Sequence, residues 1–322
     1  GLAISGVLGS AGFAAVTGSS VACAAAMGRI AVPEMLRYRY DPGLAAGSIA
    51  AAGTIGALIP PSILFILYGI IVKVQVGQLF LGGLAVGLLT ATAYSTVIIV
   101  RVLRNPDLAP PIEEEISWKM RLVALGDVWP VLVLVLGVFG GLFAGIFTPT
   151  EAGGVGAAMS LTIAFFKRSI DLRGIWSSLM ETLTISSSIF IIAIGASMLT
   201  RFFAYSGAGD EIAEIVQGMG VSPLLLILAV ALLYILLGMF LEPIGAMLLT
   251  MPILLPLIET AEINLLWFGI LVVKLLEIGM ITPPIGLNVF VLKGVMGEQI
   301  STGTIFRGVM WFIFADIVIL GL

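Results

Sequence analysis

The sequence contains no histidine, one cysteine and few charged residues. Asp, Glu, Lys and Arg make up 11% of the 322 residues, and the formal net charge is −4. Without histidine the usual imidazole base and metal ligand are missing, and the single Cys23 excludes an internal disulfide or a multi-cysteine metal site. No basic run of the kind used for nucleic-acid binding is present. These absences argue against redox and zinc chemistry and against a nucleic-acid partner, and we predict that the protein is not an enzyme.

Hydrophobic residues, in contrast, are abundant. They account for 60% of the chain and give a mean hydropathy of +1.18, which predicts an all-α, polytopic membrane protein in contact with the lipid bilayer. Segments near the ~20 residues of a bilayer crossing run approximately over 44–74, 78–100, 129–147, 152–166, 182–204, 265–292 and 305–322. Two further apolar regions, 1–36 and 222–258, are interrupted centrally by polar turns, and we interpret both as re-entrant helical hairpins.

One motif occurs twice, each time inside an apolar segment of spanning length. Its copies are Gly56-Ala57-Leu58-Ile59-Pro60-Pro61 and Gly279-Met280-Ile281-Thr282-Pro283-Pro284. Adjacent prolines remove two backbone donors and the glycine loosens the backbone before them, so the motif predicts a broken transmembrane helix. Carbonyls that lose their helical hydrogen bonds at membrane depth need another polar group or ion to bind. In transporters built from internal repeats, this is usually a coupling cation or a substrate.

The two motifs belong to a longer internal repeat. Gly56 and Gly279 lie 223 residues apart, and the same offset carries Pro33 onto Pro256 and the polar turn 17–20 onto the turn 240–243. Four of the apolar segments lie between the two broken ones, so the second break is the fifth crossing after the first, and this odd number predicts that the repeats point in opposite directions. We divide the chain into a first repeat (1–106), a cytoplasmic linker (107–128) and a second, inverted repeat (129–322). The second repeat has a long lead-in that the first lacks, and we expect roughly a hundred membrane-spanning residues to precede residue 1 in the complete transporter.

Loop charges give the expected orientation. By the crossing count, basic residues gather on one side, which is cytoplasmic by the positive-inside rule. They are Arg37, Arg39, Arg101, Arg104, Lys119, Arg121, Lys167, Arg168, Arg173, Lys293 and Arg307. The opposite side carries Glu151, Asp210, Glu211, Glu214, Glu259 and Glu262. Thr148 and Glu151 have the spacing of a helix capping box, with Pro149 at the first helical position.

The turn of the first hairpin and the first break are a candidate site. Thr17-Gly18-Ser19-Ser20 offers hydroxyls and free amides at the N-terminus of a half-helix, which suits a carboxylate. Carbonyls of Gly56, Ile59 and Pro61 could complete an oxygen cage for a hard cation. The structural alternative is that Ser19 is only a helix N-cap and Gly56 only a packing contact.

The second break offers a related set, Gly279, Thr282 and Pro284, opposite the turn 238–243. Glu242, before Pro243, either binds a ligand or caps the following helix. Lys274 and Glu277 are three residues apart on one helical face, which predicts a structural ion pair. Asp316, in the last apolar segment, has no partner that the sequence identifies.

Several of these stretches resemble one family. The matching runs are Thr17-Gly18-Ser19-Ser20-Val21-Ala22, Met27-Gly28-Arg29-Ile30, Pro33-Glu34-Met35, 47–54, Ile59-Pro60-Pro61-Ser62, Phe147-Thr148-Pro149-Thr150-Glu151-Ala152 and 277–286. Together they resemble the large membrane subunit of tripartite ATP-independent periplasmic (TRAP) transporters. The resemblance implies an elevator-type, sodium-driven secondary transporter of the bacterial inner membrane. It also implies a small four-helix membrane subunit and a soluble periplasmic binding protein as partners, and a small organic acid, such as a C4-dicarboxylate, as substrate.

Carried over by motif, the family's functional residues fall on the candidates above. One Na⁺ would lie at Thr17, Ser19, Gly56, Ile59 and Pro61, and a second at Gly279, Thr282 and Pro284. Substrate would lie between the hairpin turns, at Ser19, Ser20, Glu242, Pro243 and Thr282. The main alternative is a stand-alone sodium/dicarboxylate symporter, which needs no binding protein. A membrane enzyme or a channel is disfavoured, because no paired catalytic set and no acidic or carbonyl ring is evident.

Overall fold

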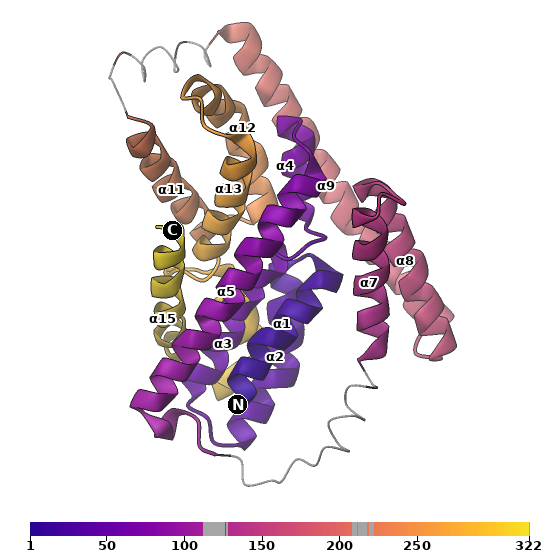
Figure 1. Cartoon of the computed structure of the whole chain (residues 1–322), viewed down its shortest axis with the longest axis vertical. Helices are drawn as coiled ribbons and strands as arrows, with labels where there is room; N and C mark the ends of the chain where they lie inside the picture. Colours follow the sequence, from indigo (N-terminus) through magenta and orange to yellow (C-terminus); the bar gives the residue numbers. More distant parts are fainter. Residues whose placement is uncertain (112–125, 127, 208–210, 212–217, 219–221, 322) are drawn as a thin grey trace. The chain divides into compact units, whose positions relative to one another are not determined.

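The computed structural model describes residues 1–111, 126, 128–207, 211, 218 and 222–321, which form helices and turns and contain no strand (Figure 1). The α-helices are α1 (Leu2–Thr17), α2 (Ser20–Arg37), α3 (Pro42–Gly53), α4 (Ile63–Val72), α5 (Val76–Arg104), α7 (Trp129–Phe143), α8 (Pro149–Phe166), α9 (Leu172–Ser206), α11 (Pro223–Phe240), α12 (Pro243–Thr260), α13 (Leu265–Gly279), α14 (Leu287–Met296) and α15 (Thr302–Leu320). Short 3₁₀ turns are η1 (Thr54–Ala57), η2 (Pro106–Leu108) and η3 (Gly297–Gln299). Most of the predicted linker 107–128 lies outside the described residues, as do Lys119, Arg121, Asp210 and Glu214.

Several helices have the length and composition of membrane spans. Within the described residues there are 5 of them: α5, the segment Leu172–Leu199 of α9, α11, α12 and α15. The predicted class, an all-helical polytopic membrane protein, is confirmed at this level.

The same order of elements occurs twice along the chain. Two helices joined by a tight turn (α1 and α2) are followed by an interrupted helix (α3 and α4) and a long helix (α5). Later, α11 and α12 are followed by the interrupted pair α13 and α14 and by α15. Both predicted breaks are present, because no α-helix covers residues 54–62 or 280–286. Each Pro-Pro bond, Pro60–Pro61 and Pro283–Pro284, is cis.

Side-chain caps define where the interrupted helices begin. The Asp41 carboxylate accepts the Leu44 N–H (2.8 Å) at the start of α3, and Ser62 accepts the Phe65 N–H (3.4 Å) at the start of α4. Asn264 accepts the N–H groups of Leu266 (2.9 Å) and Trp267 (3.1 Å) at the start of α13. These side chains satisfy amide donors that the first turn of a helix leaves open.

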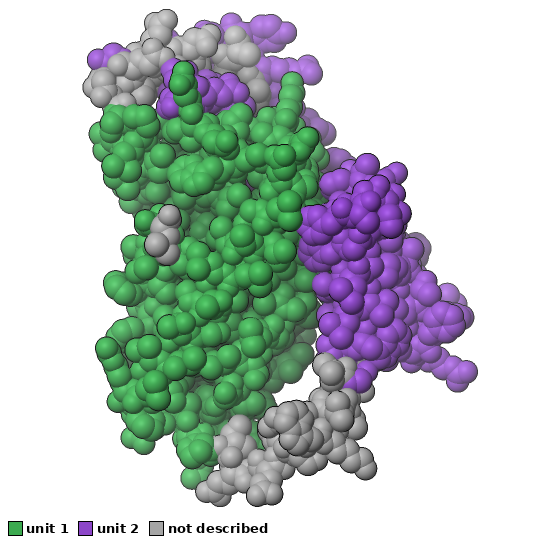
Figure 2. Space-filling model, viewed as in Figure 1, with its two compact units in different colours: residues 1–114, 221–246, 262–322 green, residues 115–220, 247–261 purple. Residues whose placement is uncertain are grey.

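The chain divides into two compact units (Figure 2). Unit 1 comprises residues 1–114, 221–246 and 262–322, and unit 2 comprises residues 115–220 and 247–261. All residues of the candidate sites belong to unit 1. Its centre is α3, whose residues from Gly43 to Gly53 are all buried.

Small residues allow α3 and α15 to approach closely. Gly43 and Gly47 are spaced as in a GxxxG motif. A Cβ on Gly47 would lie 2.5 Å from the carbonyl carbon of Gly308, and one on Gly308 would overlap the Gly43 carbonyl. Backbones can therefore meet directly at this crossing, which is how helices associate when both sides of the interface are apolar.

Unit 2 contains α7, α8, α9 and most of α12, and α7 packs against α8. The predicted capping box at the start of α8 is confirmed. The Glu151 carboxylate accepts the Thr148 N–H (2.8 Å), while the Thr148 hydroxyl accepts the Glu151 N–H (3.3 Å).

Candidate functional site

The turn between α1 and α2 packs directly on the first helix break. Gly18 ends α1 in the left-handed conformation (φ 59°), which is accessible to glycine at little cost. A side chain there would also overlap the carbonyl oxygen of Pro61. On the other face, a Cβ on Gly56 would lie 2.9 Å from the Ser19 carbonyl oxygen. Glycines at both positions thus bring two irregular backbone segments into contact.

The residues predicted for the first cation site divide into two groups. The backbones of Ser19, Gly56 and Pro61 lie together at this contact. Two other candidates are held within their own helical turns, because the Thr17 hydroxyl donates to the Phe13 carbonyl (3.2 Å) and the Ile59 N–H donates to the Ile55 carbonyl (3.0 Å). The Ser19 hydroxyl caps α2 by accepting the Ala22 N–H (3.4 Å). Capping and proximity to the break therefore coexist at Ser19.

The second break packs differently. A Cβ on Gly279 would lie 2.6 Å from the Cα of Gly238 and 2.8 Å from the Ile235 carbonyl oxygen, both in α11. Gly279 thus faces the last turn of α11, at the first residue of the predicted turn 238–243, whereas Gly56 faces the residues that begin α2. The Thr282 hydroxyl donates to the Ile278 carbonyl (2.6 Å), and the Thr282 N–H donates to the Gly279 carbonyl (3.0 Å). Gly279 and Thr282 are therefore linked through the backbone of the break.

A small cavity lies between the turns of the two helix pairs. It has a volume of about 40 Å³, and its lining includes Ser19 and Ser20 from the first turn, Glu242 and Pro243 from the second, and Glu277 from α13. Four of the five predicted substrate residues thus line one cavity, and Thr282 does not. Cavities that enclose organic ligands are typically several hundred Å³, so this one has the size of an ion with a few waters.

Glu242 has two roles in this geometry. Its carboxylate accepts the N–H groups of Ile244 (3.0 Å) and Gly245 (3.2 Å), so it caps α12. The same side chain lines the cavity and is exposed. Both alternatives considered for this residue are therefore compatible with its position.

Glu277 is a site residue that the sequence did not predict, because its spacing from Lys274 indicated a structural ion pair. The structure places the Ser20 hydroxyl 2.6 Å from Glu277 Oε2, and the hydroxyl donates this hydrogen bond. Glu277 is only 1% exposed. Its other carboxylate oxygen, Oε1, has no hydrogen-bond partner. The signal available in the sequence was its position two residues before Gly279.

The predicted Lys274–Glu277 ion pair is wrong. Lys274 Nζ instead contacts Asp316 Oδ1 at 2.6 Å, and it also donates to the Thr90 hydroxyl at 3.0 Å. Asp316 therefore has the partner that the sequence did not identify. Residues three apart share a helix face only approximately, and Lys274 lies on the side of α13 that faces α5 and α15.

The Lys274–Asp316 pair belongs to a buried polar network. The Tyr94 hydroxyl donates to Asp316 Oδ2 at 2.7 Å and lies 3.3 Å from the Thr54 hydroxyl in η1. Lys274, Asp316, Tyr94 and Thr54 are each at most 1% exposed. The network thus connects the helix before the second break with the turn that contains Gly56.

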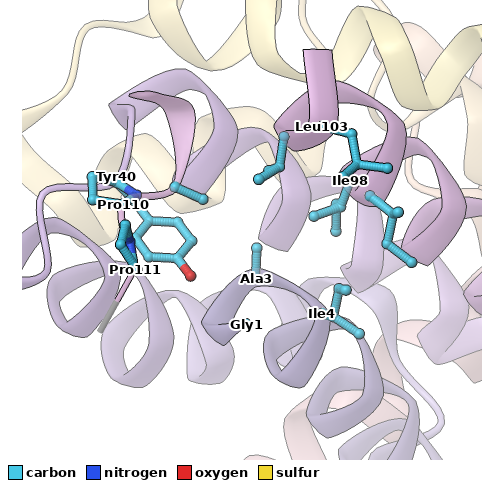
Figure 3. A pocket seen from close by; sticks show the side chains of 11 residues that line it. Gly1, Ala3, Ile4, Tyr40, Ile98, Leu103, Pro110 and Pro111 are labelled. Carbon is cyan, nitrogen blue, oxygen red and sulfur yellow. The ribbon is translucent and has the colours of Figure 1, made fainter. Parts of the chain in front are cut away.

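A larger cavity elsewhere in unit 1 has a different character. It has a volume of about 340 Å³ and is lined mainly by aliphatic side chains and prolines, among them Ala3, Ile98, Leu103 and Pro110 (Figure 3). Its one hydroxyl, that of Tyr40, already accepts the Leu2 N–H at 3.1 Å. This lining offers nothing to offset the charge of an organic anion.

Metal ligands of the usual kind do not cluster in the part of the chain that the structure describes. No group of three or more His, Cys, Asp or Glu side chains there could hold a metal ion. A cation in unit 1 would have to use backbone carbonyls, hydroxyls and single carboxylates.

Comparison with known proteins identifies the family. The whole chain, residues 1–322, matches the family described as "Tripartite ATP-independent periplasmic transporter, DctM component". The C4-dicarboxylate TRAP transporter large permease protein DctM of Pseudomonas aeruginosa is 35% identical over 314 residues, which are 97% of this chain and 72% of that protein. The proteins of the same name from Vibrio cholerae and Rhodobacter capsulatus are 34% and 32% identical, over 99% and 95% of this chain and 75% and 72% of their own lengths. The resemblance deduced from the motifs is confirmed, and the chain belongs to the DctM family of TRAP transporter large permeases.

Proposed function

We propose that this chain is the large permease of a Na⁺-coupled secondary transporter that imports a small organic anion across the bacterial inner membrane. Membership of the TRAP family supports transport of organic acids together with a small permease and a periplasmic binding protein. The C4-dicarboxylate named in the three relatives above makes a dicarboxylate the first substrate class to test.

The observation that carries the proposal is the backbone contact between the first hairpin turn and the first break. Gly18 and Gly56 bring the carbonyls of Pro61 and Ser19 to a place where two irregular segments meet. Oxygen atoms of this kind suit Na⁺, a hard cation. In transporters built from inverted repeats, unwound backbone at membrane depth commonly coordinates the coupling ion. We assign one Na⁺ to this contact and a second to Gly279, Thr282 and Pro284.

The substrate anion would enter between the two turns, beside Ser19, Ser20, Glu242 and Pro243, and the turns would have to move apart to admit it, because the cavity there measures only about 40 Å³. A carboxylate in an apolar cavity costs several kcal/mol unless its charge is offset. The residues that line the cavity include no Lys or Arg. Bound cations, assisted by half-helix dipoles, would therefore supply the positive charge.

The architecture proposed with this function is an inverted repeat whose hairpins are re-entrant and which works by an elevator-type movement. The twofold order of elements supports the repeat. The number of crossings between the two breaks in the sequence supports the inversion.

Substrate binding to the complete transporter at zero and saturating Na⁺ tests the coupling, with choline chloride holding the ionic strength constant. We expect affinity to rise with Na⁺ and more than one Na⁺ to bind per anion. Linkage then requires substrate to tighten Na⁺ binding by the same factor. Equal substrate affinities in the two conditions would reject cation-coupled binding and favour a channel.

The stand-alone symporter alternative needs a separate comparison. Reconstituted transporter is assayed for uptake with and without the cognate binding protein. We expect uptake only when the binding protein is present, and uptake from free substrate alone would favour the symporter.

A further inference from the structure

One residue that lines the cavity between the two turns has a buried carboxylate oxygen without a hydrogen-bond partner. Glu277 is 1% exposed, lines the cavity, and uses only Oε2, which accepts the Ser20 hydroxyl at 2.6 Å. Oε1 is buried and has no hydrogen-bond partner. Leaving a buried charged acceptor unpaired is expensive, so such an atom in a native structure calls for an explanation.

The neighbouring charges do not neutralise Glu277. Lys274, on the same helix, is 2.6 Å from Asp316 and is shared with the Thr90 hydroxyl. Glu242, the other ionisable side chain that lines the cavity, is also acidic. Lys274 and Asp316 cancel each other, so an ionised Glu277 would have no matching positive charge among these side chains.

A second unsatisfied group lies close by, on α14. Both side-chain polar atoms of Asn288 are buried without partners. Asn288 Nδ2 and the Ser20 carbonyl oxygen each lie 3.2 Å from the position of a Cβ on Gly53. The amide therefore sits beside the first turn of α2, near the serine that holds Glu277. Amide orientation follows the local hydrogen-bond network, so this group can turn either its oxygen or its nitrogen toward a ligand.

We propose that Glu277 Oε1 binds a monovalent cation, giving a third cation site in addition to those at the two breaks. A single charge matches the one buried carboxylate, because Glu242 is exposed and already accepts two N–H groups of α12. A divalent ion would call for more acidic ligands than the described residues gather in any one place. The cavity of about 40 Å³ has room for an ion with water ligands. The Ser20 hydroxyl fixes the carboxylate, and the unpartnered Asn288 amide lies beside the Ser20 backbone.

This site would tie α13 to the first hairpin through a bound ion. Ser20 begins α2, whereas Glu277 lies two residues before the second break. The inference rests on the proposed Na⁺ coupling and specifies where an additional Na⁺ binds. The bound cation would also offset the negative charge of Glu277, one of the two acidic side chains that line the cavity assigned to the substrate anion.

The test is a Na⁺ titration of substrate binding to the complete transporter carrying Glu277→Gln. Gln has the same shape and can still accept the Ser20 hydroxyl, but it lacks the charge. Residues that merely orient a metal ligand change metal affinity by roughly 10–100-fold, so we expect half-saturating Na⁺ to rise at least about tenfold. The Hill coefficient for Na⁺ should fall by about one. Glu298→Gln, the same change at an exposed carboxylate, should leave both values unchanged.

Two further measurements separate ion binding from a structural role. Thermal unfolding without Na⁺ should show that Glu277→Gln is at least as stable as the wild type, whereas the stabilisation gained on adding NaCl should be smaller in the variant. Glu277→Asp keeps the charge but withdraws the oxygens, so it should retain the Hill coefficient with weaker Na⁺ affinity. If Glu277→Gln does not fold, the Glu277→Asp titration decides, and a wild-type Na⁺ affinity there would overturn the site.

The outcomes also distinguish this inference from the proposed function. A wild-type protein whose substrate affinity ignores Na⁺ would refute both. If wild-type substrate binding depends on Na⁺ and the Na⁺ titration of Glu277→Gln is unchanged, only the Glu277 site is refuted. Oε1 would then bind a proton or a water molecule.

Discussion

Removing one side chain of the buried Lys274–Asp316 pair should strongly destabilise the protein, whereas replacing both with apolar side chains should destabilise it much less. Its side chains are 2% and 0% exposed, with 2.6 Å between Nζ and Oδ1. Removing one partner from such a pair leaves an isolated charge in the interior, which costs about 3–5 kcal/mol. We therefore expect Lys274→Met and Asp316→Leu each to destabilise the protein by about this amount.

The double variant Lys274→Met with Asp316→Leu should recover most of the loss. Replacing a buried ion pair by apolar residues of similar volume is often neutral or better. The hydroxyls of Thr90 and Tyr94 would lose their charged partners, but neither would be left unsatisfied, because Thr90 still donates to the Val86 carbonyl (2.8 Å) and Tyr94 still lies 3.3 Å from the Thr54 hydroxyl. The double variant should therefore lose less stability than the sum of the two single variants, by a coupling energy of at least about 2 kcal/mol.

Thermal unfolding of purified protein in detergent, followed by tryptophan fluorescence, measures these differences. Each kcal/mol shifts the midpoint by roughly 2–4 °C, so each single variant should unfold about 10 °C lower than the wild type. Arg37→Met is the matched control, because Arg37 and Glu34 form an exposed pair at 3.6 Å whose side chains are 70% and 45% exposed. Exposed pairs contribute about 0–1 kcal/mol. Neutral single variants, or additive effects in the double variant, would refute the reasoning.

Two other predictions concern the breaks and the hairpins. Gly56→Val and Gly279→Val should weaken Na⁺-dependent uptake more than Ser62→Ala does. The Cβ on residue 56 would lie 2.9 Å from the Ser19 carbonyl oxygen, and the Cβ on residue 279 would lie 2.6 Å from the Gly238 Cα. Wild-type Na⁺ dependence in both valine variants would reject the assigned cation sites. In a Cys23→Ser background, which removes the only cysteine, single cysteines at Ser222 and Glu259 should react with an impermeant maleimide from the same, periplasmic side. Labelling from opposite sides would show that the segment crosses the membrane and is not re-entrant.

Local sequence was sufficient for the elements that depend on backbone chemistry. Adjacent prolines after a glycine break a helix wherever it packs, because two N–H donors are lost. The capping box at Thr148 follows from side chains that can reach the first-turn amides. Family membership also followed from short local motifs, and the match of residues 1–322 to the family confirmed it.

Only the tertiary structure decided which polar groups meet in the interior. Lys274 pairs with Asp316, 42 residues away, although Glu277 is three residues away, and Ser20 reaches Glu277 across 257 residues. The sequence also suggested equivalent environments for the two breaks, yet Gly56 meets the residues that begin α2 and Gly279 meets the last turn of α11. In a low-dielectric interior, the energy of a charge depends on whichever group packing brings within a few ångströms. Helical periodicity specifies a face, and the choice of partner follows from how α5, α13 and α15 pack together.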